Sequence, residues 1–156
     1  MSRLSELKEK KKLDNNGFSL VELIIVIAIM AVLIGVLAPQ YLKYVEKSRK
    51  SADEDNFQQI ISAVQVYYSD PDHSLPAVTA DTNYDITINA NGAVSAVDSI
   101  IDTACKDAGV TVNNITIKSS AYKGITLRFT QKADGSTAFT VNNAELAKAL
   151  AITQHS

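Results

Sequence analysis

The chain has 156 residues, 46% of them hydrophobic, and its 15 basic and 17 acidic side chains give a formal net charge of −2. This length and composition suffice for one compact domain with a core. The slightly acidic balance argues against nucleic-acid binding, because no basic stripe recurs beyond the residues that flank one apolar segment. A single cysteine, Cys105, can close no intrachain disulfide, so packing alone must hold the fold.

The first element in chain order is an apolar segment, 18–38, in which Glu22 is the one charged residue. As a helix it would be roughly 31 Å long, which matches the hydrocarbon core of a bilayer. Residues 1–17 before it carry a net charge of +2, which predicts a cytoplasmic N-terminus and an exported C-terminus. A secretory signal fits poorly, since the apolar run is long and cleavage after Ala38 would leave Pro39 next to the cut. The sequence therefore predicts a single membrane span.

Glu22 is unusual within this span. An ionised carboxylate in hydrocarbon costs roughly 2–3 kcal/mol, less near the interface. No lysine or arginine lies within reach on the same helix. We therefore expect its partner to come from outside the chain, the alternative being a tolerated glutamate at the membrane interface.

The residues GFSLVEL (17–23), the apolar run after them and the residues PQY (39–41) resemble the N-terminal signature of type IV pilins and their pseudopilin relatives. The resemblance covers about the first 50 residues. It implies that prepilin peptidase cleaves between Gly17 and Phe18 on the cytoplasmic side, and that the new Phe18 amine is N-methylated. It also implies that the carboxylate of Glu22 neutralises the Phe18 amine of a neighbouring subunit when the helices bundle into a filament core.

The resemblance further implies the partners and location of the chain. The partners are other copies of itself, prepilin peptidase, a platform protein, an assembly ATPase and the membrane. The chain would begin as a single-pass prepilin in the cytoplasmic membrane and end in a surface pilus. We predict a structural subunit that is not an enzyme and binds no cofactor. The alternatives are a pseudopilin of a type II secretion or competence system, or a membrane-tethered binding module.

Beyond the span, residues 39–69 are predicted to continue the helix as an amphipathic half that ends near Ser69, before Asp70-Pro71. Its apolar residues recur at spacings of three and four: Val45, Ala52, Phe57, Ile60, Ile61, Val64 and Tyr68. A helix from Phe18 to Ser69 would be roughly 78 Å long.

Gly35 and Pro39 mark the expected weak point of this helix. Pro39 has no amide hydrogen, so the carbonyl of Gly35 loses its helical partner, and glycine adds backbone freedom at the same place. In the filaments of related proteins the segment before this proline loses its helical form. Ala31 stands where relatives often carry glycine, so we expect here either a short melted stretch or a kink.

The amphipathic half also carries two bands of opposite charge. The basic band comprises Lys43, Lys47, Arg49 and Lys50, and the acidic band comprises Asp53, Glu54 and Asp55. The bands could pair between staggered copies, or they could form an ordinary solvated face.

The remaining residues, 70–156, predict a globular head of the α+β class, a small antiparallel sheet packed on the long helix with short additional helices. Expected strands lie at 84–88, 115–117, 125–129 and 139–141, with a hairpin turn at 132–136. Expected helices lie at 93–108, stopped by Gly109, and at 144–151, capped by Asn143.

Candidate chemical groups in the head are few. His73 and His155 have no ligand-like spacing, and no metal site is predicted. Residues 81–85 (DTNYD) begin like a calcium loop but lack the required glycine and closing glutamate, so we expect an ordinary polar loop. Cys105 is expected to be a small core residue.

Overall fold

The computed structural model describes residues 18–155. The chain divides into two compact units, Met1–Leu42 and Lys43–Ser156, which we call the N-terminal unit and the head unit. Helix α1 (Leu20–Ser69) has residues in both, so the head unit includes the last part of α1 as well as the predicted globular region.

Helix α1 ends at Ser69, as predicted, and begins at Leu20, two residues after the expected start. It ends there because Pro71 disfavours a helical conformation at Asp70. Of the predicted apolar face, Phe57, Ile60, Ile61 and Val64 are buried, Val45 and Tyr68 are half-buried and Ala52 is exposed. Asp53 and Ala63 are buried as well. The presence of a carboxylate on this buried face was not predicted.

Among residues 18–155, five strands form one sheet in the order β2-β1-β3-β4-β5. They are β1 (Thr82–Ile88), β2 (Val94–Val97), β3 (Thr126–Gln131), β4 (Thr137–Val141) and β5 (Thr153–Gln154). The first four pair antiparallel, with Tyr84 opposite Phe129 and Leu127 opposite Val141. β5 pairs with β4 in parallel. The hairpin turn predicted at 132–136 connects β3 and β4, and Gly135 adopts a φ of 84° that glycine accepts without strain.

The helix predicted at 93–108 is wrong in its first part. Val94–Val97 is strand β2, and the helix α2 covers only Ser99–Asp107. The chain turns before β2 at Gly92, whose φ is 89° and whose N–H donates to Asn89 O. Asp98 then takes an extended conformation as the N-cap of α2. The apolar residues of this segment therefore belong to a strand and a helix, and their combined spacing in the sequence resembles that of one helix.

The strand predicted at 115–117 is also wrong. Thr116 forms an isolated bridge with Ala93, and the segment otherwise contains the short turns η2 (Val112–Asn114) and η3 (Ser120–Tyr122). Helix α3 (Ala144–Ala149) is capped by Asn143 as predicted, because the Asn143 side chain accepts a hydrogen bond from Leu146 N at 2.9 Å. It ends two residues before the predicted position.

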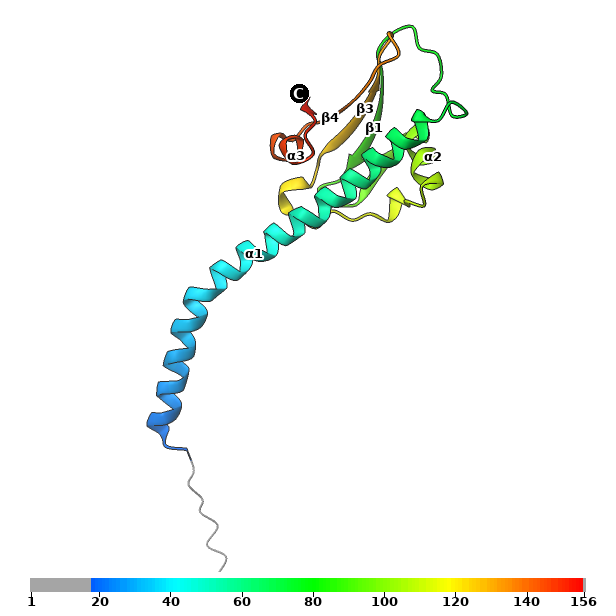
Figure 1. Ribbon diagram of the computed structural model, residues 1–156. Coiled ribbons are helices and arrows are strands. Elements are labelled where there is room, and N and C mark those ends of the chain that lie inside the picture. The colour runs from blue at the N-terminus through cyan, green and yellow to red at the C-terminus, as the bar shows by residue number, and fades with distance from the viewer. Residues whose placement is uncertain (1–17, 156) are drawn as a thin grey trace, which may run out of the picture. The chain divides into compact units, whose positions relative to one another are not determined.

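The head unit has two layers, with the last part of α1 lying along one face of the sheet and α2 and α3 at its sides (Figure 1). Side chains from α1, the sheet and both short helices share one core, which includes Phe57, Ile101, Leu127, Phe129 and Leu146. The predicted α+β class is confirmed, although the parallel strand β5 makes the sheet mixed where an antiparallel one was predicted. Cys105 is completely buried in this core, as predicted.

Candidate functional site

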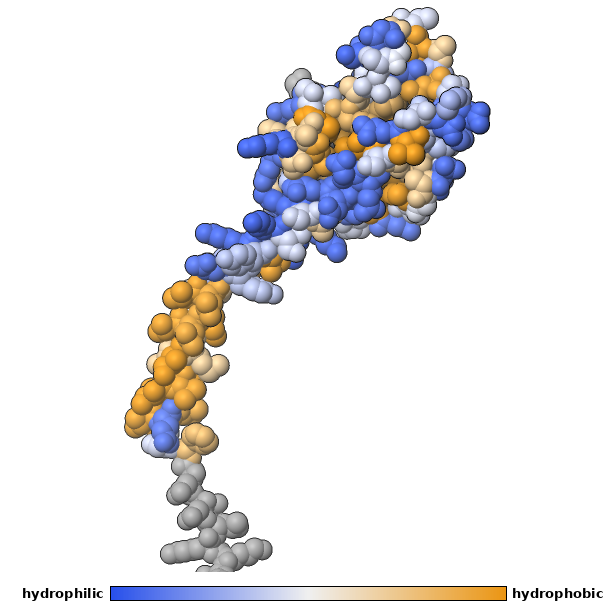
Figure 2. Space-filling model, in the orientation of Figure 1, coloured by the Kyte–Doolittle hydropathy of each residue, from blue (hydrophilic) through white to orange (hydrophobic). Residues whose placement is uncertain are grey.

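The N-terminal unit carries the candidate assembly residues on the first part of α1. Its side chains between Phe18 and Ala38 are exposed, and in this range apolar residues occupy nearly every position around the helix. The face seen in Figure 2 is accordingly almost entirely hydrophobic. By length and composition α1 can cross a membrane. A helix that is apolar all round requires an apolar environment, either lipid or other protein.

Phe18 is 88% exposed and lies just before α1. Gly17 and the rest of the predicted leader lie outside the described residues. Of the two residues at the expected cleavage point, the structure thus describes only Phe18.

Glu22 lies in the first turn of α1, where its Oε2 accepts a hydrogen bond from Ser19 N at 2.8 Å. The Ser19 hydroxyl accepts in turn from Val21 N at 3.3 Å. This reciprocal arrangement resembles a capping box, in which a serine and a glutamate three residues later satisfy the open amides at a helix start. Glu22 thus has an intrachain partner that was not predicted from the sequence, although the spacing Ser19-x-x-Glu22 is typical of a capping box. Its charge still has no cationic partner among the described residues.

The expected weak point lies within an unbroken helix, because α1 continues through both Gly35 and Pro39. A Cβ atom added at Gly35 would meet no other atom within 4 Å. Nothing in the packing of the single chain therefore requires glycine at this position.

Gly35→Ala is expected to stabilise this part of α1 by about 1 kcal/mol, since alanine loses less backbone entropy than glycine in a helix. Amide hydrogen exchange at the residues just before Pro39, measured on the chain in detergent micelles, should slow about fivefold. Ala31→Gly is the matched reverse change and should accelerate it. Equal exchange in all three proteins would show that this segment is not a weak point.

A second constellation lies in the head unit, where three carboxylates of α1 hold residues 118–122. Asp53 is fully buried and accepts hydrogen bonds from Lys118 N, at 3.1 and 3.0 Å to its two oxygens, and from Ser119 N at 2.6 Å. Glu46 accepts from the Ser119 hydroxyl at 2.8 Å and from Ser120 N at 2.9 Å. These residues fix an irregular segment to the helix.

The third carboxylate is Glu54, which accepts a hydrogen bond from the buried Tyr122 hydroxyl at 2.6 Å. Burial, and then this carboxylate, raise the pKa of Tyr122. Hydrogen bonds from Ser119 and Ser120 lower the pKa of Glu46. A carboxyl whose pKa is lowered by folding stabilises the fold above its unfolded pKa of about 4.5, and this contribution is lost as the pH falls further.

These contacts change the interpretation of the two charge bands. Asp53 and Glu54 are engaged inside the head unit, which leaves Asp55 as the exposed member of the acidic band. In the basic band, Lys50 Nζ lies 2.6 Å from Glu145 Oε1 on α3. The acidic band is therefore not an intact surface that another copy could contact.

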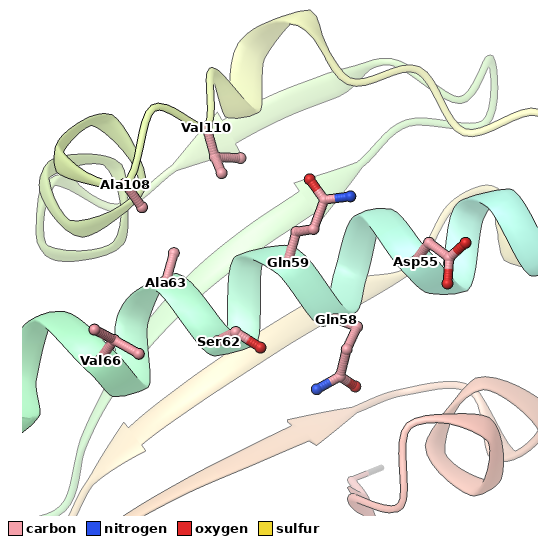
Figure 3. A pocket seen from close by; sticks show the side chains of 8 residues that line it. All are labelled: Asp55, Gln58, Gln59, Ser62, Ala63, Val66, Ala108 and Val110. Carbon is pink, nitrogen blue, oxygen red and sulfur yellow. The ribbon is translucent and has the colours of Figure 1, made fainter.

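A groove of about 620 Å³ runs beside α1 in the head unit. Gln59 and Ala63 on α1 point toward Val110 and Ala108, whereas Gln58 points to the other side of the helix (Figure 3). Asp55 is the one ionisable residue among the groove's lining residues. The side chains that line the groove are amides, small residues and one carboxylate. They include no pair of groups that could act as general acid and general base.

The other candidate groups have structural roles in the described part of the chain. Residues 82–85 belong to strand β1 and not to a loop, which corrects the prediction for residues 81–85. Asp85 forms a bidentate pair with Arg128, with both N–O distances at 2.8 Å, and Asp81 accepts a hydrogen bond from Ala133 N.

The two histidines of the chain are His73 and His155. The ring of His73 stacks on the ring of Tyr67, with the ring centroids 4.1 Å apart. Burial, followed by the nearby Arg128, lowers the pKa of His155.

Cys105 is expected to resist thiol reagents in the folded chain. Burial, and the nearby Asp102, raise its pKa to about 11, so at pH 8 only about one thousandth of the thiol is ionised. Labelling with a chromogenic disulfide reagent should be negligible in the native protein and complete in urea. Rapid labelling without denaturant would contradict the buried position.

The N-terminal segment is similar to segments of known proteins. The family described as "Prokaryotic N-terminal methylation motif" matches residues 12–38. The type IV major pilin protein PilA of Myxococcus xanthus is 33% identical over 58 residues, which cover 37% of this chain and 26% of that protein. The chain therefore matches about a quarter of the length of that relative.

A second relative extends the similarity into the head. The fimbrial protein EcpC of Eikenella corrodens is 30% identical over 113 residues, which cover 69% of this chain and 73% of that protein. No solved structure matches the chain. The N-terminal motif, the long helix with its apolar first part, the α+β head and a relative of similar length agree, and the chain belongs to the type IV pilin family.

Proposed function

We propose that this pilin is a structural subunit of a type IV pilus, made as a membrane-inserted prepilin and assembled through its N-terminal helix. The exposed apolar surface of the N-terminal unit supports this proposal most directly. Such a surface can lie in lipid before assembly and against the helices of other copies afterwards. One helix thus serves as the membrane anchor and then as the filament core.

Cleavage between Gly17 and Phe18 by prepilin peptidase is the proposed first step, followed by methylation of the Phe18 amine. The family motif at residues 12–38 supports both. The proposed orientation places the N-terminus in the cytoplasm, as the basic residues 1–17 favour. A platform protein and an assembly ATPase are the proposed machinery that moves the cleaved subunit from the cytoplasmic membrane into the surface filament.

Glu22 is proposed to neutralise the Phe18 amine of a neighbouring subunit. Its Oε2 is used by Ser19 N, and Oε1 accepts no hydrogen bond among the described residues, so one oxygen can accept from an incoming ammonium group. Within an apolar bundle, loss of one member of such a pair costs roughly 3–5 kcal/mol, because the other charge is left uncompensated. The pair would therefore fix the register between neighbours.

In functional terms we divide the chain into the leader 1–17, the span and filament core 18–38, the amphipathic half 39–69 and the head 70–156. Gly35 and Pro39 are proposed to let the core helix yield when the subunit leaves the bilayer. No catalytic step is assigned to any residue, in keeping with a family of structural subunits.

Mass spectrometry of filaments sheared from the cell surface tests the proposal. We expect the chain to begin at Phe18, with or without one added methyl group. A chain that begins at Met1 and stays in the membrane fraction would refute it. Processed chain in the membrane with no sheared filaments would favour the pseudopilin alternative, and a defined ligand bound by unassembled protein would favour the binding module.

A further inference from the structure

Two large hydrophobic side chains of the head unit are exposed, Tyr44 at 69% and Val66 at 73%, both on α1. Tyr44 lies one turn before Lys47 on the same side of the helix, and Lys43 precedes it directly. Neither lysine forms a salt bridge with a residue in the described part of the chain. We call Lys43, Tyr44 and Lys47 the basal patch. It combines an aromatic ring with two cations, which is a typical composition for a contact surface.

The opposite end of the helical part of the head unit contains a cavity of about 510 Å³, which we call the distal pocket. It lies between the end of α1, residues 69–75 and the β3–β4 hairpin. Its apolar lining includes Val64, Tyr68, Leu75 and Phe129. Tyr68 is held in place because its hydroxyl donates to Ile100 O at 3.1 Å and its ring lies 6.3 Å from that of Phe129, with only 12° between their planes.

The wall of the distal pocket also contains a buried polar group. Gln131 is 6% exposed, its Nε2 donates to Pro76 O at 2.8 Å, and its Oε1 accepts from the Tyr84 hydroxyl at 3.3 Å. These bonds connect the hairpin to the segment after α1. The pocket is therefore formed by side chains that are already fixed, which lowers the entropic cost of filling it.

The two surfaces have opposite charge. Residues 70–81 beside the pocket contain three aspartates and no lysine or arginine. Asp70 lines the pocket, and its carboxylate is exposed and accepts from Asp72 N at 2.9 Å. A cationic surface with one projecting ring thus has its chemical complement on the same molecule, at the other end of a helix.

We propose that the basal patch of one copy of this chain docks on the distal pocket of another copy. The Tyr44 ring enters the apolar part of the pocket beside Tyr68 and Leu75, and Lys47 faces Asp70. Because the two surfaces differ, the contact is heterologous, and repetition of such a contact produces an open helical filament and not a closed dimer. This inference rests on the proposed function and specifies one of the contacts between heads.

The contact also defines a spacing. Tyr44 and Asp70 are 26 residues apart, so the surfaces are separated by roughly 39 Å along the helix. Copies whose α1 helices are parallel and that make this contact must be displaced by about this distance along the helix direction. A helical reconstruction of the filament should contain a pair of subunits with that displacement.

A disulfide cross-link tests the contact in assembled filaments. The double variant Tyr44→Cys with Ser74→Cys, in which Ser74 lines the pocket, should give a ladder of covalent oligomers after mild oxidation. Each single variant should give only monomer on a denaturing gel. Cys105 stays in place because it is buried. Filaments of the double variant without a ladder would overturn the docking proposal, whereas absence of filaments from the wild-type chain would overturn the proposed function.

Charge reversal covers the case in which the double variant does not assemble. Lys47→Glu should reduce the yield of sheared filaments at least fivefold, and adding Asp70→Lys to the same chain should restore it to within twofold. Lys148→Glu reverses an exposed lysine on α3 and should leave the yield unchanged. Failure of Asp70→Lys to restore the yield, or equal loss from Lys148→Glu, would exclude the proposed pairing.

Discussion

Replacing Asp53 with alanine is expected to lower the free energy of unfolding of the head unit by about 3 kcal/mol. The carboxylate is fully buried and is the acceptor for Lys118 N and Ser119 N. Each buried amide left without a partner costs about 1–3 kcal/mol, and the loss of the side chain leaves a small void as well. Urea unfolding of the full chain in detergent, followed by tyrosine circular dichroism, measures the change.

Two further variants separate the buried carboxylate from a general effect of charge. Asp55→Ala removes an exposed carboxylate two residues later on the same helix and should change stability by less than about 0.5 kcal/mol. Asp53→Asn keeps one acceptor oxygen and should lose about half as much stability as Asp53→Ala. If Asp53→Ala were no worse than Asp55→Ala, the attachment of residues 118–122 to α1 would contribute nothing measurable.

The elements that could be predicted are those whose residues repeat with a fixed period over many positions. The ends of elements were predicted from local residues instead: Pro71 after α1, the turn residues 132–136 between β3 and β4, and the Asn143 cap of α3. The boundary between β2 and α2 was missed because Val97 and Ile100 fit a helical spacing across it, although Asp98 between them is a common N-cap residue. β5 has only two residues, too few for any pattern.

The contacts of residues 118–122 could not be predicted because they join side chains to backbone groups 65 to 74 positions away. Such hydrogen bonds leave no periodic signal in a sequence. One clue was nevertheless present, since Asp53 lies four residues before Phe57 and continues the spacing of the buried face. A carboxylate in a buried position needs a partner. Glu22 is likewise a carboxylate in an apolar segment, and its partner within the chain is the amide of Ser19.

Substitution of Glu22 is expected to have the largest effect on assembly. Glu22→Val should leave the head unit folded, because Glu22 belongs to the N-terminal unit, but should abolish most filament formation. An uncompensated Phe18 amine in an apolar bundle costs roughly 3–5 kcal/mol at each contact, which corresponds to at least a hundredfold weaker association. The yield of sheared filaments, compared with the amount of processed subunit in the membrane, measures the effect.

Glu22→Gln distinguishes the two roles that the structure and the family suggest for this residue. Glutamine can accept the hydrogen bond from Ser19 N as glutamate does, so the start of α1 keeps its cap. It carries no charge and cannot neutralise an ammonium group. If pairing with a neighbour is the essential role, Glu22→Gln should fail in assembly nearly as completely as Glu22→Val.

The opposite result is equally informative. Should Glu22→Gln assemble normally while Glu22→Val does not, the hydrogen bond at the helix start would be the essential function, and the proposed pair with Phe18 would be wrong. Ser19→Ala provides the matched control, because it removes the hydroxyl that accepts from Val21 N but leaves the Ser19 amide that donates to Glu22. It should cost the helix start about 1 kcal/mol and leave assembly largely intact if charge pairing dominates. Filament yield across these three variants therefore assigns Glu22 to its own helix or to its neighbour.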